Sequence, residues 1–387
     1  MIFRRSFLFT FIIVSMSAAA FAAGYLTREW RDTSLNAFPI LKESYNILIN
    51  NGLKQVPTSP NLEYGMIRGM VEAYDDPYTI FVAPAQHELE SNALQGSFGG
   101  IGVRLGRDPQ SNWVLFPIPG SPAEKAQIME GDRLLGVEQL SVSAITSQDD
   151  IQSAIRGPVG QRVKITVGRP PDFSPIVLQV KRAEIPLPSV TWHLALEDAR
   201  VGVIEINLIA ESTPQEILNA VKDLQERGAS SFILDLRNNP GGLLTAGVDV
   251  ARLFLKDGVV IQQQYRGKEV ETFRVDRPGP LVNLPLVVLI NHGSASAAEI
   301  IAGSLKIHKR ALLIGSPSYG KDTIQLVFDL KDGSSLHVTS AHWWIPDLQP
   351  PLGGVGLQPD ISVAHQTEES GPDADIQAGI TALYGSK

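Results

Sequence analysis

The sequence predicts a mixed α/β fold that is divided into more than one domain. In residues 201–255, short apolar runs alternate with segments of helical character, a pattern typical of a mainly parallel sheet packed by helices. In residues 97–182, the pattern changes to short strands and glycine-containing turns. The chain has 387 residues, of which 43% are hydrophobic, so it is long enough to bury two or three cores.

The composition argues against several classes of function. The formal net charge of −8 offers no basic surface, so nucleic acid is not an expected partner. Cysteine is absent, which excludes disulfides, a thiol nucleophile and cysteine-ligated metal. No His-Glu-x-x-His or comparable spacing occurs, and residues 99–102 lack the Lys-Ser/Thr of a nucleotide loop. We therefore expect neither a metal nor another cofactor.

The amino-terminal residues 1–27 predict export from the cytoplasm. Arg4 and Arg5 precede an uncharged stretch rich in Phe, Ile, Val and Ala, as in an export signal. Residues 20–22 fit a small-x-small cleavage site, but the stretch is also long enough to cross a bilayer core of about 20 residues. Residues 1–27 are thus a signal peptide or a membrane anchor, and the rest of the chain is expected to be extracytoplasmic or periplasmic.

Residues 28–95 are predicted to form a mostly helical segment that is broken at residues 57–60, where two prolines occur. Apolar residues recur at helical spacing in its first part. Such a stripe is expected to pack in a core or at a dimer contact; its members are Ile40, Leu41, Tyr45, Ile47 and Leu48.

The best candidates for chemistry are the hydroxyl of Ser296 and the amine of Lys321. A hydroxyl needs a neighbouring base, and lysine can be that base only if burial lowers its pKa and makes it neutral. Apolar runs at residues 287–290 and 311–314 precede the two residues and resemble buried strands. Helix-compatible residues follow Ser296, which places it at a strand-to-helix junction with unpaired N–H groups. We therefore predict a serine nucleophile with a lysine base.

A third part of this machinery is predicted in residues 235–242. The segment follows the apolar run 232–234, so it forms a turn at the end of a strand. The glycine pair Gly241–Gly242 can expose backbone N–H groups to a developing oxyanion. Pro-Gly-Gly alone is usually only a turn, but together with Ser296 and Lys321 it indicates an oxyanion site.

Taken together, these segments resemble the carboxy-terminal processing peptidases, or tail-specific proteases. Residues 291–300 are similar to the nucleophile segment of that family, and residues 319–325 are similar to its base segment. Residues 62–79 and 354–361 also match family segments, so the resemblance extends over most of the chain. It implies a serine endopeptidase with a Ser–Lys dyad, a crotonase/ClpP-like peptidase domain over residues 185–363 and a tail over residues 364–387.

The resemblance also implies roles for particular residues. Ser296 would be the nucleophile, Lys321 the base and Gln325 the amide that orients it. The oxyanion donors would be the N–H of Ala297 and that of Gly241 or Gly242.

The chain departs from the family pattern at Ala298, Tyr319 and Asp322. A carboxylate beside the base would keep it protonated if the two side chains met. Because adjacent side chains of a strand point to opposite faces, we expect Asp322 to face away from Lys321, and Gln325 to share its side.

Residues 97–182 resemble a PDZ domain inserted in the chain. Residues 97–103 are similar to its carboxylate-binding loop and first strand, 151–155 to its second helix and 161–167 to a late strand. In this fold, backbone N–H groups capture a chain terminus while the peptide extends a sheet edge. The peptide-binding residues would be Phe98, Gly99, Gly100, Ile101 and Gly102.

The resemblance implies cleavage of exported proteins that are recognised through free, apolar carboxy-terminal tails, with the PDZ domain as gate and tether. A lipoprotein or other adaptor and a homodimer remain open as partners. A catalytically silent PDZ scaffold and a periplasmic adaptor are alternatives, the first supported by Asp322. A Ser-His-Asp triad is disfavoured, because no Gly-x-Ser-x-Gly elbow surrounds Ser296; its candidate histidines would be His292, His308, His337 and His342.

Overall fold

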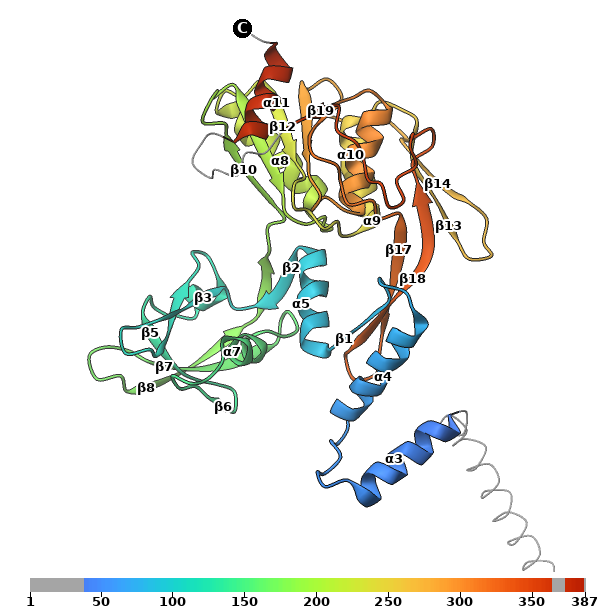
Figure 1. Ribbon diagram of the computed structural model, residues 1–387. Coiled ribbons are helices and arrows are strands. Elements are labelled where there is room, and N and C mark those ends of the chain that lie inside the picture. Colours follow the sequence, from blue (N-terminus) through green and yellow to red (C-terminus); the bar gives the residue numbers. More distant parts are fainter. Residues whose placement is uncertain (1–37, 364–372, 386–387) are drawn as a thin grey trace, which may run out of the picture. The chain divides into compact units, whose positions relative to one another are not determined.

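The computed structural model describes residues 38–363 and 373–385 (Figure 1). The chain divides into two compact units, the first of which ends at Tyr74. The predicted signal peptide or anchor, residues 1–27, lies outside the described residues. Within the described ranges, no helix is both long and apolar enough to cross a membrane.

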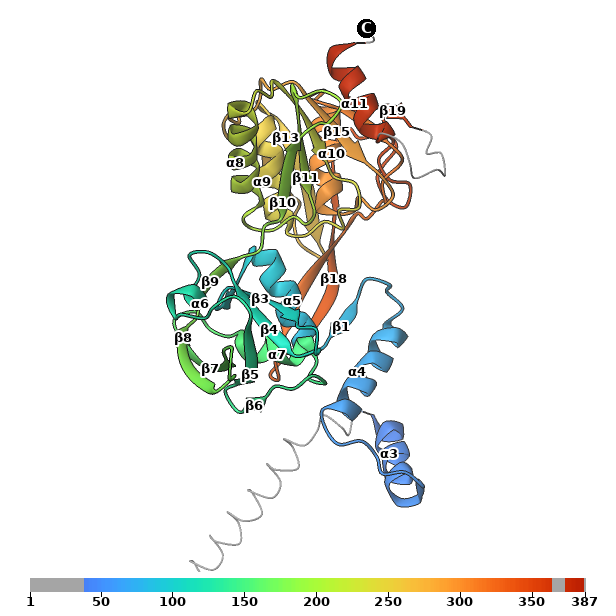
Figure 2. The ribbon, with the colours of Figure 1, turned by 90° about the vertical axis from the view of Figure 1, so that its left-hand side faces the viewer.

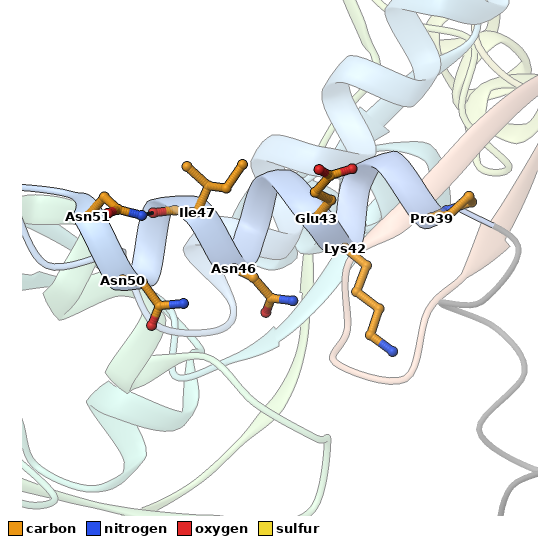
Figure 3. A pocket seen from close by; sticks show the side chains of 7 residues that line it. All are labelled: Pro39, Lys42, Glu43, Asn46, Ile47, Asn50 and Asn51. Carbon is orange, nitrogen blue, oxygen red and sulfur yellow. Dashed lines mark hydrogen bonds between the residues drawn. The ribbon is translucent and has the colours of Figure 1, made fainter.

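The described part of the first unit consists of α3 (Pro39–Asn51) and α4 (Asn61–Tyr74). The break predicted at residues 57–60 lies between them and contains a cis Ser59–Pro60 bond. The apolar stripe of α3 is not buried within the described chain, since Ile40 is 76% exposed and Ile47 is 55% exposed. Lys42 and Asn46 extend from one side of α3 and Ile47 from the other (Figure 3). The shallow hollow drawn there is lined by this helix alone, so it does not define a site.

The second unit begins with a turn in which the Asp76 carboxylate accepts hydrogen bonds from Thr79 Oγ1 at 2.5 Å and from the Tyr78 N–H at 3.3 Å. Strand β1 (Ile80–Val82) and helix α5 (Pro84–Gln95) follow. Strand β1 pairs with β18 (Ser335–Trp344), far along the chain. The segment predicted to be helical up to residue 95 is therefore interrupted by a strand.

Residues 103–181 form a small antiparallel sheet of order β3-β4-β5-β7-β8, with β6 added to β5. The sheet and helix α7 enclose a separate apolar core. The elements are β3 (Val103–Arg107), β4 (Trp113–Pro117), α6 (Pro122–Lys125), β5 (Asp132–Val137), β6 (Leu140–Ser141), α7 (Gln148–Ile155), β7 (Arg162–Gly168) and β8 (Pro175–Lys181).

The two connections to this small domain run side by side. Strand β2 (Ser97–Gly100) pairs antiparallel with β9 (Ala183–Pro186), so the chain enters and leaves at the same place, as an insertion requires. The first strand of the PDZ sheet is consequently β3, whereas most of residues 97–103, predicted as loop and first strand, belongs to this connection.

The peptidase domain is built on a six-stranded sheet of order β10-β11-β12-β15-β16-β19. All neighbouring pairs from β11 to β19 are parallel, and only β10 is antiparallel. The mainly parallel α/β fold predicted from the alternating pattern is confirmed. The strands are β10 (Val190–Leu194), β11 (Val201–Ile206), β12 (Ser231–Asp235), β15 (Leu286–Ile290), β16 (Leu312–Gly315) and β19 (Ile361–Ser362).

Helices cover both faces of this sheet. Helices α8 (Thr213–Glu226), α9 (Leu244–Phe254) and α10 (Ala297–Ile307) share the larger core, and α11 (Ala374–Tyr384) packs on the other face. Figure 2 shows α8 and α9 on one side of the strands and α11 on the other. The segment 364–387, predicted only as a tail, therefore contains a helix, because Ile376 and Ile380 pack on the sheet.

A second sheet carries the lysine segment. Strand β18 pairs with β13 (Val259–Tyr265) near its carboxyl end and with β17 (Thr323–Asp329) along most of its length. Strand β14 (Glu271–Arg274) completes this sheet beside β13. Figure 1 shows β17 and β18 as a long ribbon. Lys321 lies two residues before β17, so the ribbon positions the backbone that carries its side chain.

Candidate active site

Ser296 lies between the buried strand β15 and helix α10, at the junction predicted from the sequence. Its backbone has φ +54° and ψ −117°, in the region that non-glycine residues rarely occupy. Such a conformation costs on the order of 1–3 kcal/mol and persists only where neighbours enforce it. The N–H of the following residue, Ala297, forms no hydrogen bond within the described structure and is therefore available to a ligand.

A buried carboxylate, Glu299, joins the nucleophile segment to the base segment. Its Oε2 accepts the backbone N–H of Ser296 at 2.8 Å and that of Lys321 at 3.0 Å. Its Oε1 accepts Ser318 Oγ at 2.5 Å and the Gly320 N–H at 2.7 Å. Burial raises the Glu299 pKa, and the four hydrogen bonds oppose that effect. One oxygen atom thus holds the backbones of both predicted catalytic residues.

The side chain of Lys321 is held by Gln325 and Tyr78. Its Nζ donates to Gln325 Oε1 at 2.7 Å and lies 4.8 Å from the centre of the Tyr78 ring. The amide nitrogen of Gln325 donates to the Tyr78 backbone carbonyl, which fixes the oxygen end of the amide toward the lysine. Burial lowers the Lys321 pKa, although the charges of Asp76 and Glu299 oppose this shift.

The structure brings the predicted nucleophile and base to one place without joining their side chains. Glu299 ties their backbones together, whereas Lys321 Nζ donates to Gln325 and, in the described structure, forms no hydrogen bond with Ser296 Oγ. The lysine side chain must therefore leave this position before it can take a proton from Ser296.

Asp322, the departure that could have disabled the lysine, faces another side. Its Oδ1 lies 4.0 Å from His342 Nδ1, and its Oδ2 would lie 2.7 Å from a Cβ placed on Gly353. The charges that raise the Lys321 pKa are those of Asp76 and Glu299. The aspartate therefore does not hold Lys321 in its charged form.

The glycine turn lies directly against Ser296. A Cβ placed on Gly241 would lie 2.9 Å from Ser296 Cβ and 3.0 Å from the Ala297 nitrogen. The Gly241 N–H is already used, since it donates to Asn239 Oδ1 at 2.8 Å. The N–H of Gly242 has no acceptor among the described residues. The Ile209 N–H donates to the Gly241 carbonyl, and the Ile209 carbonyl accepts the N–H of Leu243.

Three asparagines join the glycine turn to the nucleophile loop by hydrogen bonds. No role was predicted for them from the sequence. The Asn238 N–H donates to Asn291 Oδ1 at 2.9 Å, and Asn291 Nδ2 returns a bond to Asn238 Oδ1 at 3.0 Å. The Asn239 carbonyl accepts the Ala295 N–H at 2.9 Å. Their positions within residues 235–242 and 291–300 are the only sequence signal that could have indicated this role.

Arg237, in the same turn, is bound to helix α11. Its guanidinium contacts Asp235 at 2.6 Å, Asp373 at 2.9 Å and Asp375 at 3.0 Å. The Asp375 side chain is fully buried, and Asp373 caps α11 by accepting the Ile376 N–H at 3.2 Å. The carboxy-terminal helix, missed from sequence, thus supports the turn that carries the glycine pair.

The PDZ domain has a groove of about 350 Å³ between the edge strand β3 and helix α7. Of the predicted peptide-binding residues, Phe98, Ile101 and Gly102 line it. Gly99 and Gly100 instead pair with β9. The prediction that Gly99 and Gly100 bind the peptide has no support from the groove lining, and it stays a prediction.

The alternative chemistries find no support in the described residues. None of the four candidate histidines hydrogen-bonds to Ser296: His292 packs on the Tyr319 ring at 5.6 Å, and His308 Nε2 contacts the Val259 carbonyl. His337 Nε2 contacts Ser335 Oγ, and His342 faces Asp322. Among the described residues, no group of three or more His, Asp and Glu side chains is placed to hold a metal ion.

Comparison with known proteins identifies the family. The profile of Peptidase family S41 matches residues 200–363, and that of the PDZ domain matches residues 114–169. The carboxyl-terminal-processing protease of Picosynechococcus sp. is 32% identical over 359 residues, which cover 91% of this chain and 85% of the relative. The carboxy-terminal processing protease CtpA of Bacillus subtilis is 32% identical over 339 residues, 87% of this chain and 72% of the relative.

Among solved structures, the photosystem II D1 C-terminal processing protease is 29% identical, with a TM-score of 0.46 over 88% of this chain and 92% of the other. From the sequence identity and the coverage of its relatives, this chain belongs to the carboxyl-terminal-processing proteases of peptidase family S41, with an inserted PDZ domain.

Proposed function

We propose that the protein is a serine endopeptidase that cleaves exported proteins recognised through their carboxy-terminal tails. The observation that carries this proposal is the environment of Lys321. Burial lowers its pKa, and Glu299 holds its backbone beside that of Ser296. A lysine that loses its proton easily beside a serine in a strained backbone conformation is suited to activating that hydroxyl.

In the proposed reaction, neutral Lys321 accepts the hydroxyl proton while Ser296 Oγ attacks the scissile carbonyl. Lys321 then donates that proton to the leaving amine, and the C–N bond breaks to give an acyl-enzyme and a new amine terminus. Water, deprotonated by Lys321, attacks the acyl carbon and releases Ser296 with its proton restored. Before the reaction, Gln325 would position the lysine amine through its 2.7 Å hydrogen bond.

The oxyanion would be held by the N–H groups of Ala297 and Gly242. Both lack an intramolecular acceptor in the described structure, whereas the Gly241 N–H is bound to Asn239. Gly241 would act by its small size, since any side chain there would meet Ser296 and Ala297. A preformed pair of N–H donors stabilises the charge that develops on the carbonyl oxygen.

The PDZ domain is proposed to hold the substrate tail and to control the dyad. Lys321 Nζ must leave its present position to reach Ser296 Oγ, so binding of a tail can favour the catalytic arrangement only if it favours that shift. The groove beside β3 offers a free sheet edge and apolar walls for a chain terminus.

The remaining proposals concern location and partners. We place the protein outside the cytoplasm, attached to the cytoplasmic membrane if residues 1–27 are retained, on the basis of the amino-terminal sequence. The exposed apolar residues of α3 are consistent with a homodimer contact. A lipoprotein or other adaptor could deliver substrates. A silent scaffold loses its support, since Asp322 faces away from Lys321.

The test is a cleavage assay with an unfolded protein substrate that ends in a free, apolar tail. We expect cleavage by the wild-type protein, essentially none by Ser296→Ala or Lys321→Ala, and slower cleavage when the tail is amidated or residues 97–182 are deleted. Wild-type rates in either point variant would refute the dyad. Equal rates on free and amidated tails would refute recognition through the terminus but leave the peptidase assignment standing.

A further inference from the structure

The PDZ groove has two chemically different faces. Strand β3 is the free edge of its sheet, and Val103 and Leu105 on this strand pack against the domain core. Arg104, between them, is exposed and points to the opposite face of the strand, because successive side chains of a strand alternate. Its guanidinium lies 5.5 Å from the ring of Phe116, its register partner on β4.

The described lining of the groove is positively charged. It contains Arg104 and Arg156 together with Gln148 and Gln152. Among the described residues that line the groove, none carries a carboxylate. Neither arginine is paired with a described carboxylate; each guanidinium instead lies over a phenylalanine ring. Asp150, on the same helix as the glutamines, accepts a hydrogen bond from Ser147 Oγ at 2.7 Å and does not line the groove. This lining contrasts with the net charge of −8 of the whole chain.

The orientation of a bound tail follows from the loop that precedes β3. If its terminal carboxylate lies at Ile101 and Gly102, the tail runs antiparallel to β3, with upstream residues beside Arg104 and Leu105. Its last side chain enters the apolar side of the groove, which Ile101, Val103 and Ile155 form. By alternation, the side chains one and three positions before the last share the face of Arg104.

We propose that this PDZ groove selects carboxy-terminal tails that carry an acidic residue one or three positions before an apolar last residue, and that Arg104 reads this charge. The inference rests on the proposed capture of substrate tails and specifies their chemistry. An exposed ion pair at the rim of a binding site contributes little affinity. A ligand residue with the same positive charge as the arginine, however, is strongly disfavoured.

The inference is tested by fluorescence anisotropy with the full chain carrying Ser296→Ala, which prevents cleavage of the probe. The probes are peptides with the same apolar last residue and Glu, Gln or Lys at the position one or three before it. We expect the Glu peptide to bind about two- to fivefold more tightly than the Gln peptide, and the Lys peptide to bind most weakly. At 0.5 M salt, these differences should shrink because exposed charges are screened over less than about 10 Å.

Arg104→Glu should reverse the order, so that the Lys peptide binds best. Lys181→Glu is the matched control: it makes the same charge change at the exposed end of β8, on the far edge of the same sheet, and should keep the original order. Equal affinities of the Glu and Lys peptides, or an unchanged order in Arg104→Glu, would overturn the inference and leave tail capture intact. Failure of every peptide to bind would overturn tail capture as well.

Discussion

Lys321 donates a hydrogen bond to Gln325 Oε1 at 2.7 Å, and the other end of that amide is fixed by the Tyr78 carbonyl. A neutral amide can hold the amine in place without stabilising its charge as a carboxylate would. Burial is the largest influence on the Lys321 pKa and lowers it. The site therefore combines an amide that orients the Lys321 amine with burial that makes this amine easier to deprotonate.

The pH dependence of catalysis should follow the titration of Lys321. The base acts only when neutral, so kcat/KM should rise as pH increases through the lysine pKa and level off above it. Gln325→Glu places a carboxylate at the same distance and should raise that pKa by about one unit or more, moving the rise to higher pH. The measurement is the pH profile of kcat/KM. An unshifted profile in Gln325→Glu would separate Lys321 from the titrating group, and Gln325→Met, which adds no charge, should not move the profile to higher pH.

Glu299→Gln should lower kcat by on the order of 10²-fold while changing KM less, because misplacement of the serine and lysine backbones impairs the chemical step. The amide would turn an N–H₂ group toward some of the four donors that Glu299 now accepts. Glu226→Gln, on the exposed surface of α8, is the control and should retain wild-type kinetics.

The same variant should also alter the pH dependence of stability. Burial raises the folded-state pKa of Glu299 above its usual value, so its contribution to stability is fully present below the unfolded-state pKa and is lost as pH rises through the folded-state pKa. Urea denaturation across acidic to neutral pH should show this loss in the wild-type protein and not in Glu299→Gln. Parallel profiles of unfolding free energy against pH for the two proteins would show that the pKa of Glu299 is not raised in the folded state.

Much of the peptidase fold could be predicted from sequence because its signals are local. Alternating apolar runs and helical segments predicted β11, α8, β12 and α9 within a few residues. Family motifs pointed to Ser296 and Lys321, which the structure brings together through Glu299.

The features that could not be predicted depend on contacts between distant parts of the chain. Strand β1 forms only because β18, some 250 residues later, provides its partner. The Tyr78 carbonyl meets Gln325 across a similar separation, and the role of α11 depends on Arg237. No local pattern reports such pairings, so helix α11 in residues 364–387 could not be predicted from the sequence.

Gly241→Ala should abolish most peptidase activity. Gly241 has φ +100°, and its Cβ would come within 3.0 Å of the Ala295 oxygen, Ser296 Cβ and the Ala297 nitrogen, so the turn must move away from the nucleophile. Loss of one oxyanion donor typically lowers kcat by about 10²–10³-fold. Gly267→Ala is the control, since Gly267 also has a positive φ but open space around its Cβ. Equal activity of the two variants would show that the glycine turn does not shape the site.

Arg237→Ala should destabilise the protein because it leaves buried carboxylates without their cation. Asp375 is fully buried and Asp235 nearly so, and removing one partner of a buried ion pair costs about 3–5 kcal/mol. Arg252→Ala is the matched control: Arg252 pairs with the exposed Asp249, and such pairs contribute about 1 kcal/mol or less. Urea denaturation gives the two free energies of unfolding, and hydrogen exchange should show faster exchange in α11 for Arg237→Ala. If both variants lost the same small amount of stability and α11 stayed protected, the ion pairs between Arg237 and the carboxy-terminal helix would not contribute measurably to the free energy of unfolding.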